Sequence, residues 1–122
     1  MVANSRINRE LASRILRTVP ITEAFLFFTD IGQYNGEYAP SLSDFCDKLK
    51  SVPLKSIKFH FKRGDFERWV RDTLGDEHLA NRISKIERST HGEELRTTIQ
   101  RIAKNRLDQL KAATMTRKNM KK

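Results

Sequence analysis

IKFHFKRGDFERWVRDTLGDEHL, residues 57–79, holds the only Trp of the chain, two of its three His and three of its seven Phe. Its second half predicts a helix that begins with Asp65 as the N-cap and ends at Gly75 in a left-handed conformation. The residues that share one side of this helix are Phe66, Trp69, Val70 and Thr73. Asp76 offers a cap for a further helix, so the stretch predicts two consecutive helices packed on a core.

The first five residues of this stretch, 57–61, fit two structures. Their apolar side chains alternate with polar ones as in a strand, whereas Ile57 and His60 also lie on one face of a helix. Because the run is short and leads directly into Gly64, we predict one or two helical turns here. A short strand that pairs with residues 25–29 is the alternative.

Residues 21–31, ITEAFLFFTDI, are ambiguous in the same way, because five consecutive apolar residues fit either a helical face or a strand. We predict a helix that Thr22 caps, with the strand at residues 25–29 as the alternative. Gly32 and Gly36 then predict a turn after this element.

The other helices are predicted from apolar residues that recur every three or four positions. They run from Asn4 or Ser5 to Pro20, from Ser41 (in a Ser41-x-x-Asp44 pattern that resembles a capping box) to Pro53, onward from Asp76, and onward from Glu93. We therefore predict an all-α fold, a compact bundle of about five to six short helices. Residues 1–112 form its single domain, and residues 113–122 form a disordered basic tail.

The net charge of +9 is concentrated at the two ends of the chain. Residues 1–18 carry four Arg and one Glu, and residues 101–122 carry eight Lys or Arg and one Asp. Basic ends are typical of proteins that bind nucleic acid or another anionic partner, so we predict sequence-nonspecific binding to nucleic acid or a ribonucleoprotein. The residues predicted to make these contacts are Arg6, Arg9, Arg17, Arg101, Lys104, Lys111, Arg117, Lys118, Lys121 and Lys122.

Arg106 falls inside the apolar stripe of the last helix, so it must extend to solvent, pair with a buried acid or meet a partner. The last case motivates an alternative function, a protein-interaction or regulatory module that binds another protein or forms a homodimer. His60 and Arg106 are the residues predicted to contact such a partner or a ligand.

The chain contains no recognisable catalytic, metal-binding or cofactor-binding motif. Its three His have no mutual i, i+3 or i, i+4 spacing, and Cys46 is its single cysteine. The best enzymatic arrangement would use His60 as a base, Asp65 to orient it and Arg63 to bind an anion. Each of these residues has an ordinary structural explanation, so we predict a protein that is not an enzyme and has no metal or cofactor.

Nothing in the sequence predicts insertion into a membrane or secretion. No stretch is apolar over the roughly 18 residues that a membrane-spanning helix needs. The N-terminus lacks the apolar segment of a secretory signal. Cys46 lies in an apolar stripe, which predicts a buried thiol, and a single cysteine suits a reducing compartment. We therefore predict a cytoplasmic protein.

The central segments FLFFTDIGQYNGEYAPSLSDF, SVPLKSIKFHF and GDFERWVRDTLGDEHLA resemble a prokaryotic, largely archaeal and bacterial, domain family of unknown function. The family's pattern falls on Leu42, Phe45, Val52, Ser56, Ile57, His60, Asp65, Phe66, Trp69, Leu74, Gly75, Leu79 and Ala80. The resemblance covers roughly residues 25–110. It implies the limits of the fold but no reaction or ligand.

Overall fold

The structure is a computed structural model that describes residues 7–120, with side chains as far as Met115. The described chain contains six α-helices, two short turns of other helix types and one pair of strands. In chain order these are α1 (Arg9–Leu16), the 3-10 turn η2 (Ile21–Glu23), β1 (Phe25–Asp30), β2 (Gln33–Ala39), α2 (Leu42–Ser51), α3 (Leu54–Arg63), α4 (Asp65–Trp69), the π-helical turn η3 (Val70–Leu74), α5 (Glu77–Ser84) and α6 (Gly92–Met120).

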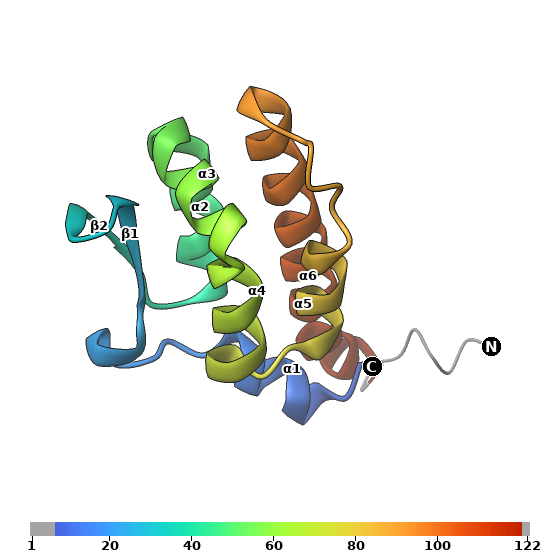
Figure 1. Cartoon of the computed structure of the whole chain (residues 1–122). Helices are drawn as coiled ribbons and strands as arrows, with labels where there is room; N and C mark the ends of the chain where they lie inside the picture. Colours follow the sequence, from blue (N-terminus) through green and yellow to red (C-terminus); the bar gives the residue numbers. More distant parts are fainter. Residues whose placement is uncertain (1–6, 121–122) are drawn as a thin grey trace.

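Helices α2 and α3 lie between the β1–β2 hairpin on one side and α6 on the other (Figure 1). Helices α1 and α5 pack against α6 as well. The hairpin contributes to the same core, because the rings of Phe25 in β1 and Phe45 in α2 meet edge to face at 5.7 Å. A hydrogen bond also connects α4 to the turn before the hairpin, because Trp69 donates its indole N–H to the carbonyl of Glu23 at 2.8 Å.

The all-α prediction is wrong, because β1 and β2 form a two-stranded antiparallel sheet. Phe25 and Phe27 are buried, whereas Leu26 between them is 39% exposed, which is the alternation of a strand. Gly32 adopts a φ of +74°, a conformation that favours glycine, and it lets the chain reverse directly after β1.

The strand alternative at residues 25–29 is confirmed, but the helix predicted over residues 21–31 is wrong. The alternative in which residues 25–29 pair with a strand at residues 57–61 is also wrong, whereas the helical turns predicted at residues 57–61 are confirmed, because those residues belong to α3. β1 instead pairs with the residues that follow it, including those predicted to form a turn. A neighbouring strand closes a much shorter loop than a distant one, so this pairing costs less conformational entropy.

The ends and caps of the central helices are mostly as predicted. Gly75 ends η3 in the left-handed conformation, with a φ of +84°. Asp76 caps α5 by accepting a hydrogen bond from the N–H of Leu79 at 3.1 Å. The capping role predicted for Asp65 is wrong, because α4 begins at that residue and its carboxylate makes no capping bond. Helix α3 is longer than predicted, with ten residues.

Helix α1 begins later than predicted. It starts at Arg9 rather than Asn4 or Ser5, because the side chain of Asn8 accepts hydrogen bonds from two amides of the first turn. Asn4 and Ser5 themselves lie outside the described residues.

The predicted disordered tail is wrong as far as Met120, because α6 continues to that residue. The last part of the helix contains no Gly or Pro, and it packs on α1. Arg9 donates from Nε to the carbonyl of Thr114 at 3.3 Å, and Ala113 packs partly buried against the core. Tertiary contact thus supports helical turns that have no apolar period of their own. Residues 121–122 lie outside the described part of the chain.

Candidate functional site

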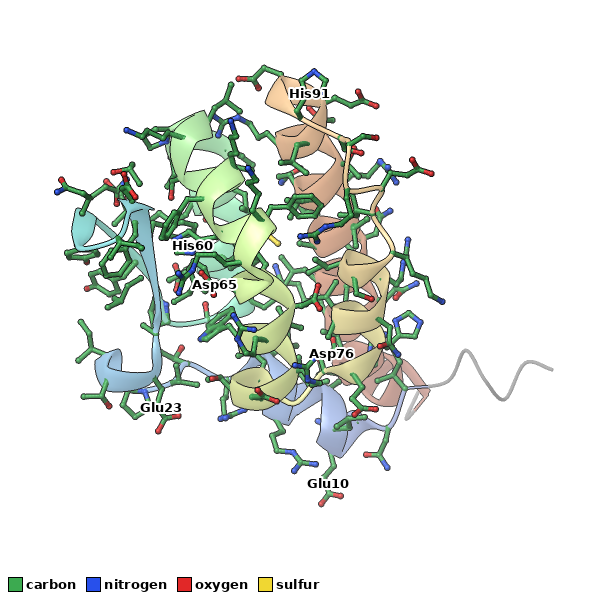
Figure 2. The ribbon with its side chains drawn as sticks, in the orientation of Figure 1. Glu10, Glu23, His60, Asp65, Asp76 and His91 are labelled. Atoms are coloured by element: carbon green, nitrogen blue, oxygen red, sulfur yellow. The ribbon has the colours of Figure 1, made fainter. Side chains whose placement is uncertain are left out.

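A groove of about 300 Å³ lies between the hairpin and the junction of α3 with α4. Two of its lining residues, His60 and Asp65, are labelled in Figure 2. Its walls are mainly apolar, and three polar side chains converge on it. The lining residues are Phe25, Leu26, Phe28, Ile31 and Gly32 from the hairpin, Phe59, His60 and Arg63 from α3, and Asp65 from α4. A concave apolar site with a few convergent polar groups is the usual form of a binding site.

His60 is buried beside the groove, and the fold uses both of its ring nitrogens. The N–H of Phe28 in β1 donates to Nε2 at 2.8 Å, and Nδ1 lies 2.8 Å from Oδ2 of Asp65. Because a backbone amide can only donate, Nε2 must be the unprotonated nitrogen and Nδ1 must carry the proton. The neutral imidazole therefore ties β1 to the start of α4.

The pKa of His60 is lowered from its ordinary value. Burial is the main cause, and it outweighs the neighbouring carboxylate of Asp65, which acts in the opposite direction. Geometry supports the same direction, because a proton on Nε2 would point at the N–H of Phe28 across 2.8 Å and abolish that hydrogen bond. Within the described structure, neutral His60 has no ring nitrogen free for proton transfer.

The carboxylate of Asp65 contacts three side chains around the junction of α3 with α4. Besides contacting His60, it accepts hydrogen bonds from Nε of Arg63 at 2.9 Å and from Nη2 of Arg68 at 2.7 Å. Burial acts to raise the pKa of Asp65, but its hydrogen bonds with His60, Arg63 and Arg68 outweigh burial and leave the pKa below its ordinary value. These contacts explain why the carboxylate is turned away from the amides that it was predicted to cap.

Arg63 and Arg68 bind the same carboxylate, but of the two only Arg63 is among the described residues that line the groove. Their side chains are equally open to solvent, at 51% and 52% exposure. The guanidinium of Arg63 also lies over the ring of Phe59, 5.0 Å from its centroid. Within the described part of the chain Arg63 donates from Nε alone, so its two terminal amino groups remain available to a ligand.

The three residues of the best enzymatic hypothesis thus lie together as that hypothesis requires, although His60 is fully hydrogen-bonded. Sequence reasoning missed the opposite wall of the groove, which Leu26, Phe28 and Ile31 provide. The strand alternative at residues 25–29 was the interpretation that would have revealed this wall. A helix was predicted instead, because the spacing of the apolar residues there fits a helix as well as a strand.

Arg106, the other residue predicted to contact a partner or ligand, is buried in the core with a carboxylate. Its Nε donates to Oδ2 of Asp76 at 2.8 Å, and its Nη2 donates to Oδ1 at 3.0 Å. Arg106 is 6% exposed and Asp76 is 1% exposed. Of the three roles predicted for Arg106, the structure thus shows pairing with a buried acid. The pair joins α6 to the N-terminus of α5, where Asp76 is labelled in Figure 2.

Several of the basic residues predicted to bind nucleic acid lie on the outer surface of α6. Arg101, Lys104 and Lys111 are all exposed there, and Lys104 forms an ion pair with Asp108 at 2.9 Å. Arg9 is exposed on α1 beside the same helix. Arg6, Lys121 and Lys122 lie outside the described residues, as do the side chains of Arg117 and Lys118.

Other arginine side chains bind the carbonyl groups at the C-terminal ends of helices. These contacts join Arg17 to Thr73 at 2.8 Å, Arg88 to Lys62 at 3.1 Å and Arg96 to Leu49 at 2.7 Å. Each satisfies a carbonyl that the helix leaves unpaired and places a cation at the negative end of the helix dipole. Part of the positive charge, including that of Arg17, therefore stabilises helix ends. Sequence reasoning missed these contacts because each connects residues that are distant along the chain.

Residues 22–121 match a family of unknown function, DUF5752. The chain belongs to this family. Membership of an uncharacterised domain family is thus confirmed, whereas its prokaryotic origin and shared motif stay predictions. The match extends beyond the predicted residues 25–110 and includes the hairpin, the groove and the basic part of α6, but not α1. No curated protein and no solved structure matches the chain.

The remaining candidates for chemistry in this DUF5752 protein are few. Burial raises the pKa of the Cys46 thiol to about 12, and the side chain is 2% exposed, as expected of a small core residue. No group of three His, Cys, Asp or Glu among the described residues is placed to hold a metal ion. No helix in the described part of the chain is long and apolar enough to cross a bilayer.

Proposed function

We propose that this DUF5752 protein is a non-enzymatic protein-binding module that receives a segment of its partner in the groove between β1 and α3. One observation carries the proposal: exposed apolar surface is concentrated on the hairpin, whose Leu26 and Ile31 line this groove. Of the six large apolar or aromatic side chains that are exposed in the described part of the chain, four lie on the hairpin, namely Leu26, Ile31, Tyr34 and Tyr38. Aromatic and aliphatic side chains around a pocket are typical of the centre of a protein interface.

The groove also suits binding because its frame is held in place. His60 and Asp65 connect β1, α3 and α4 by short hydrogen bonds, so the two walls cannot separate without breaking them. A preformed site loses less conformational entropy on binding. The same bonds leave His60 without a free nitrogen in the described structure, which favours binding over catalysis. A cytoplasmic location is part of this proposal, since a lone buried cysteine suits a reducing compartment.

Peptide display tests the proposal. Peptides of about twelve residues that a random library yields on the wild-type protein are expected to bind Leu26→Asp at least about tenfold more weakly. Ile21→Asp is the matched control, because Ile21 is more exposed, at 60%, and does not line the groove. Fluorescence anisotropy gives the affinities, and circular dichroism checks that both variants fold. Absence of enriched peptides, or equal binding to wild type and Leu26→Asp, would contradict the proposal.

Nucleic-acid binding is a second candidate, which the exposed cations of α6 favour. Arg101, Lys104 and Lys111 fall on one exposed side of this helix. Arg9 adds a further exposed cation beside Thr114. Such a row of cations can follow a phosphate backbone without reading its bases.

If this second candidate is correct, a labelled RNA or DNA of about 20 nucleotides binds at about 50 mM salt and loses most of its affinity at about 200 mM. The double variant Arg101→Glu with Lys111→Glu should weaken binding about tenfold or more, since each contact with phosphate is replaced by repulsion. Lys85→Glu, on the exposed end of α5, is the control. No binding at the lower salt concentration would exclude the candidate.

A further inference from the structure

Helix α3, which contributes one wall of the groove, is basic on its exposed surface, although Arg63 is the one cation among its groove-lining residues in the described chain. The helix contains no acidic residue, and its exposed side chains include Lys55, Lys58, Lys62 and Arg63. The acid that follows it, Asp65, is already paired with two arginines. An incoming segment with negative charge therefore meets attraction from the exposed surface of this helix, and a basic segment meets repulsion.

Arg63 is the cation best placed to recognise a carboxylate at the groove. Its position is restrained twice, by the hydrogen bond from Nε to Asp65 and by the ring of Phe59 beneath its guanidinium. The terminal amino groups of a guanidinium match the two oxygens of a carboxylate, so a restrained arginine with these groups available is well suited to this contact. A lysine in the same place would lack this planar match.

The apolar part of the groove limits what can fill it. A volume of about 300 Å³ is at the lower end of pockets that hold whole small molecules, and it suits one or two apolar side chains. Leu26 and Ile31, which line the groove, are still 39% and 77% exposed, so a ligand that covers them must extend outside the pocket. A polypeptide segment meets both conditions, because it can insert a side chain and lay its neighbours across the rim.

We infer that the partner binds through an acidic peptide segment, in which an apolar side chain fills the groove and a neighbouring Asp or Glu carboxylate binds Arg63. This inference rests on the proposed protein-binding function and adds the chemistry of the ligand. Affinity comes from the apolar anchor, whereas Arg63 and the lysines of α3 select acidic segments over neutral or basic ones.

The test is a double-mutant cycle with the peptides selected on the wild-type protein. Each peptide is synthesised a second time with Asn for Asp and Gln for Glu. Wild type is expected to bind this amide form about tenfold to a hundredfold more weakly, since a hydrogen-bonded charge pair is lost. Arg63→Gln should also bind the acidic form more weakly and should distinguish the two forms much less than wild type does, by the weaker attraction of the lysines alone.

Arg68→Gln is the matched control, because Arg68 binds the same carboxylate of Asp65 and is equally exposed but does not line the groove. It should bind the acidic peptide within about twofold of wild type. An equal loss in both arginine variants would show that Arg63 acts through Asp65 and would overturn the inference. A labelled single-stranded RNA whose binding depends on both Leu26 and Arg63 would likewise overturn it.

The outcomes separate this inference from the function on which it rests. Peptides that need Leu26 but carry no acid, or that bind Arg63→Gln as tightly as wild type, would refute the acidic ligand and leave protein binding in the groove intact. Peptides that bind without regard to Leu26 would refute the proposed function itself.

Discussion

Arg106→Met is expected to lower the free energy of unfolding by about 3–5 kcal/mol, because it leaves a buried carboxylate without its cation. Asp76 is 1% exposed, and Arg106 supplies two hydrogen bonds to it, at 2.8 and 3.0 Å. Methionine fills much of the space of the arginine stem, so the loss reports the unpaired charge more than a cavity. Urea unfolding followed by circular dichroism measures the difference.

Two further variants make this expectation specific. Lys104→Met breaks an exposed ion pair with Asp108 on the same helix, and it should cost less than about 1 kcal/mol. Adding Asp76→Ser to Arg106→Met removes the buried charge and keeps a side-chain oxygen to cap α5. This double variant should be more stable than Arg106→Met alone. A double variant less stable than the single one would show that the cap, and not the charge, governs this site.

His60→Ala is expected to lower the free energy of unfolding by about 2–4 kcal/mol at about pH 8. The substitution removes a buried ring and leaves the N–H of Phe28 and one side of the Asp65 carboxylate without their partner. A histidine that serves only a binding or catalytic role would leave stability nearly unchanged. Urea unfolding therefore distinguishes a structural from a purely functional histidine.

The effect of His60→Ala should shrink as the pH falls. The pKa of His60 is lowered from its ordinary 6.5 in the folded protein, so the unfolded chain takes up the proton first. Stability from His60 is therefore complete above about pH 6.5 and declines as the pH falls from there toward the lower folded-state pKa. The difference between wild type and His60→Ala should be smaller at about pH 5 than at about pH 8, and a constant difference would contradict this account.

His78 requires a control in this experiment, because its pKa is also lowered, by burial first and then by the charge of Arg106. It contributes a pH dependence of the same sign. When both proteins also carry His78→Gln, the stability difference caused by His60→Ala should still be smaller at the lower pH than at the higher pH if His60 is its source. The lowered pKa of Asp65 affects stability only at more acidic pH, below the ordinary value of 3.8, so it does not interfere.

The sequence predicted which polar residues of the candidate site lie close together, but it did not predict their roles. His60, Asp65 and Arg63 lie within six positions along the chain, so their proximity followed from local structure alone. The roles of these residues did not, because the hydrogen bond that fixes His60 in its neutral form comes from Phe28, in a strand more than 30 positions away. The groove needs the same strand for its second wall.

By itself, the sequence determined the elements whose signals are local. Gly75 and Asp76 predicted where one helix ends and the next is capped, and the apolar stripe of α2 predicted its buried face. These features depend on interactions within a few residues, such as caps and helical periodicity, which survive without any knowledge of the fold.

The tertiary structure alone decided the rest. Residues 25–29 are a strand because Phe25 and Phe27 pack inward while β2 pairs alongside. Helix α6 continues past residue 112 where Ala113 packs on the core and Thr114 accepts a hydrogen bond from Arg9 of α1. Arg106 forms a buried ion pair because Asp76, at the start of α5, lies beside it. In each case the local preference is weak and contacts between distant residues outweigh it, so the decisive free energy appears only when the chain folds.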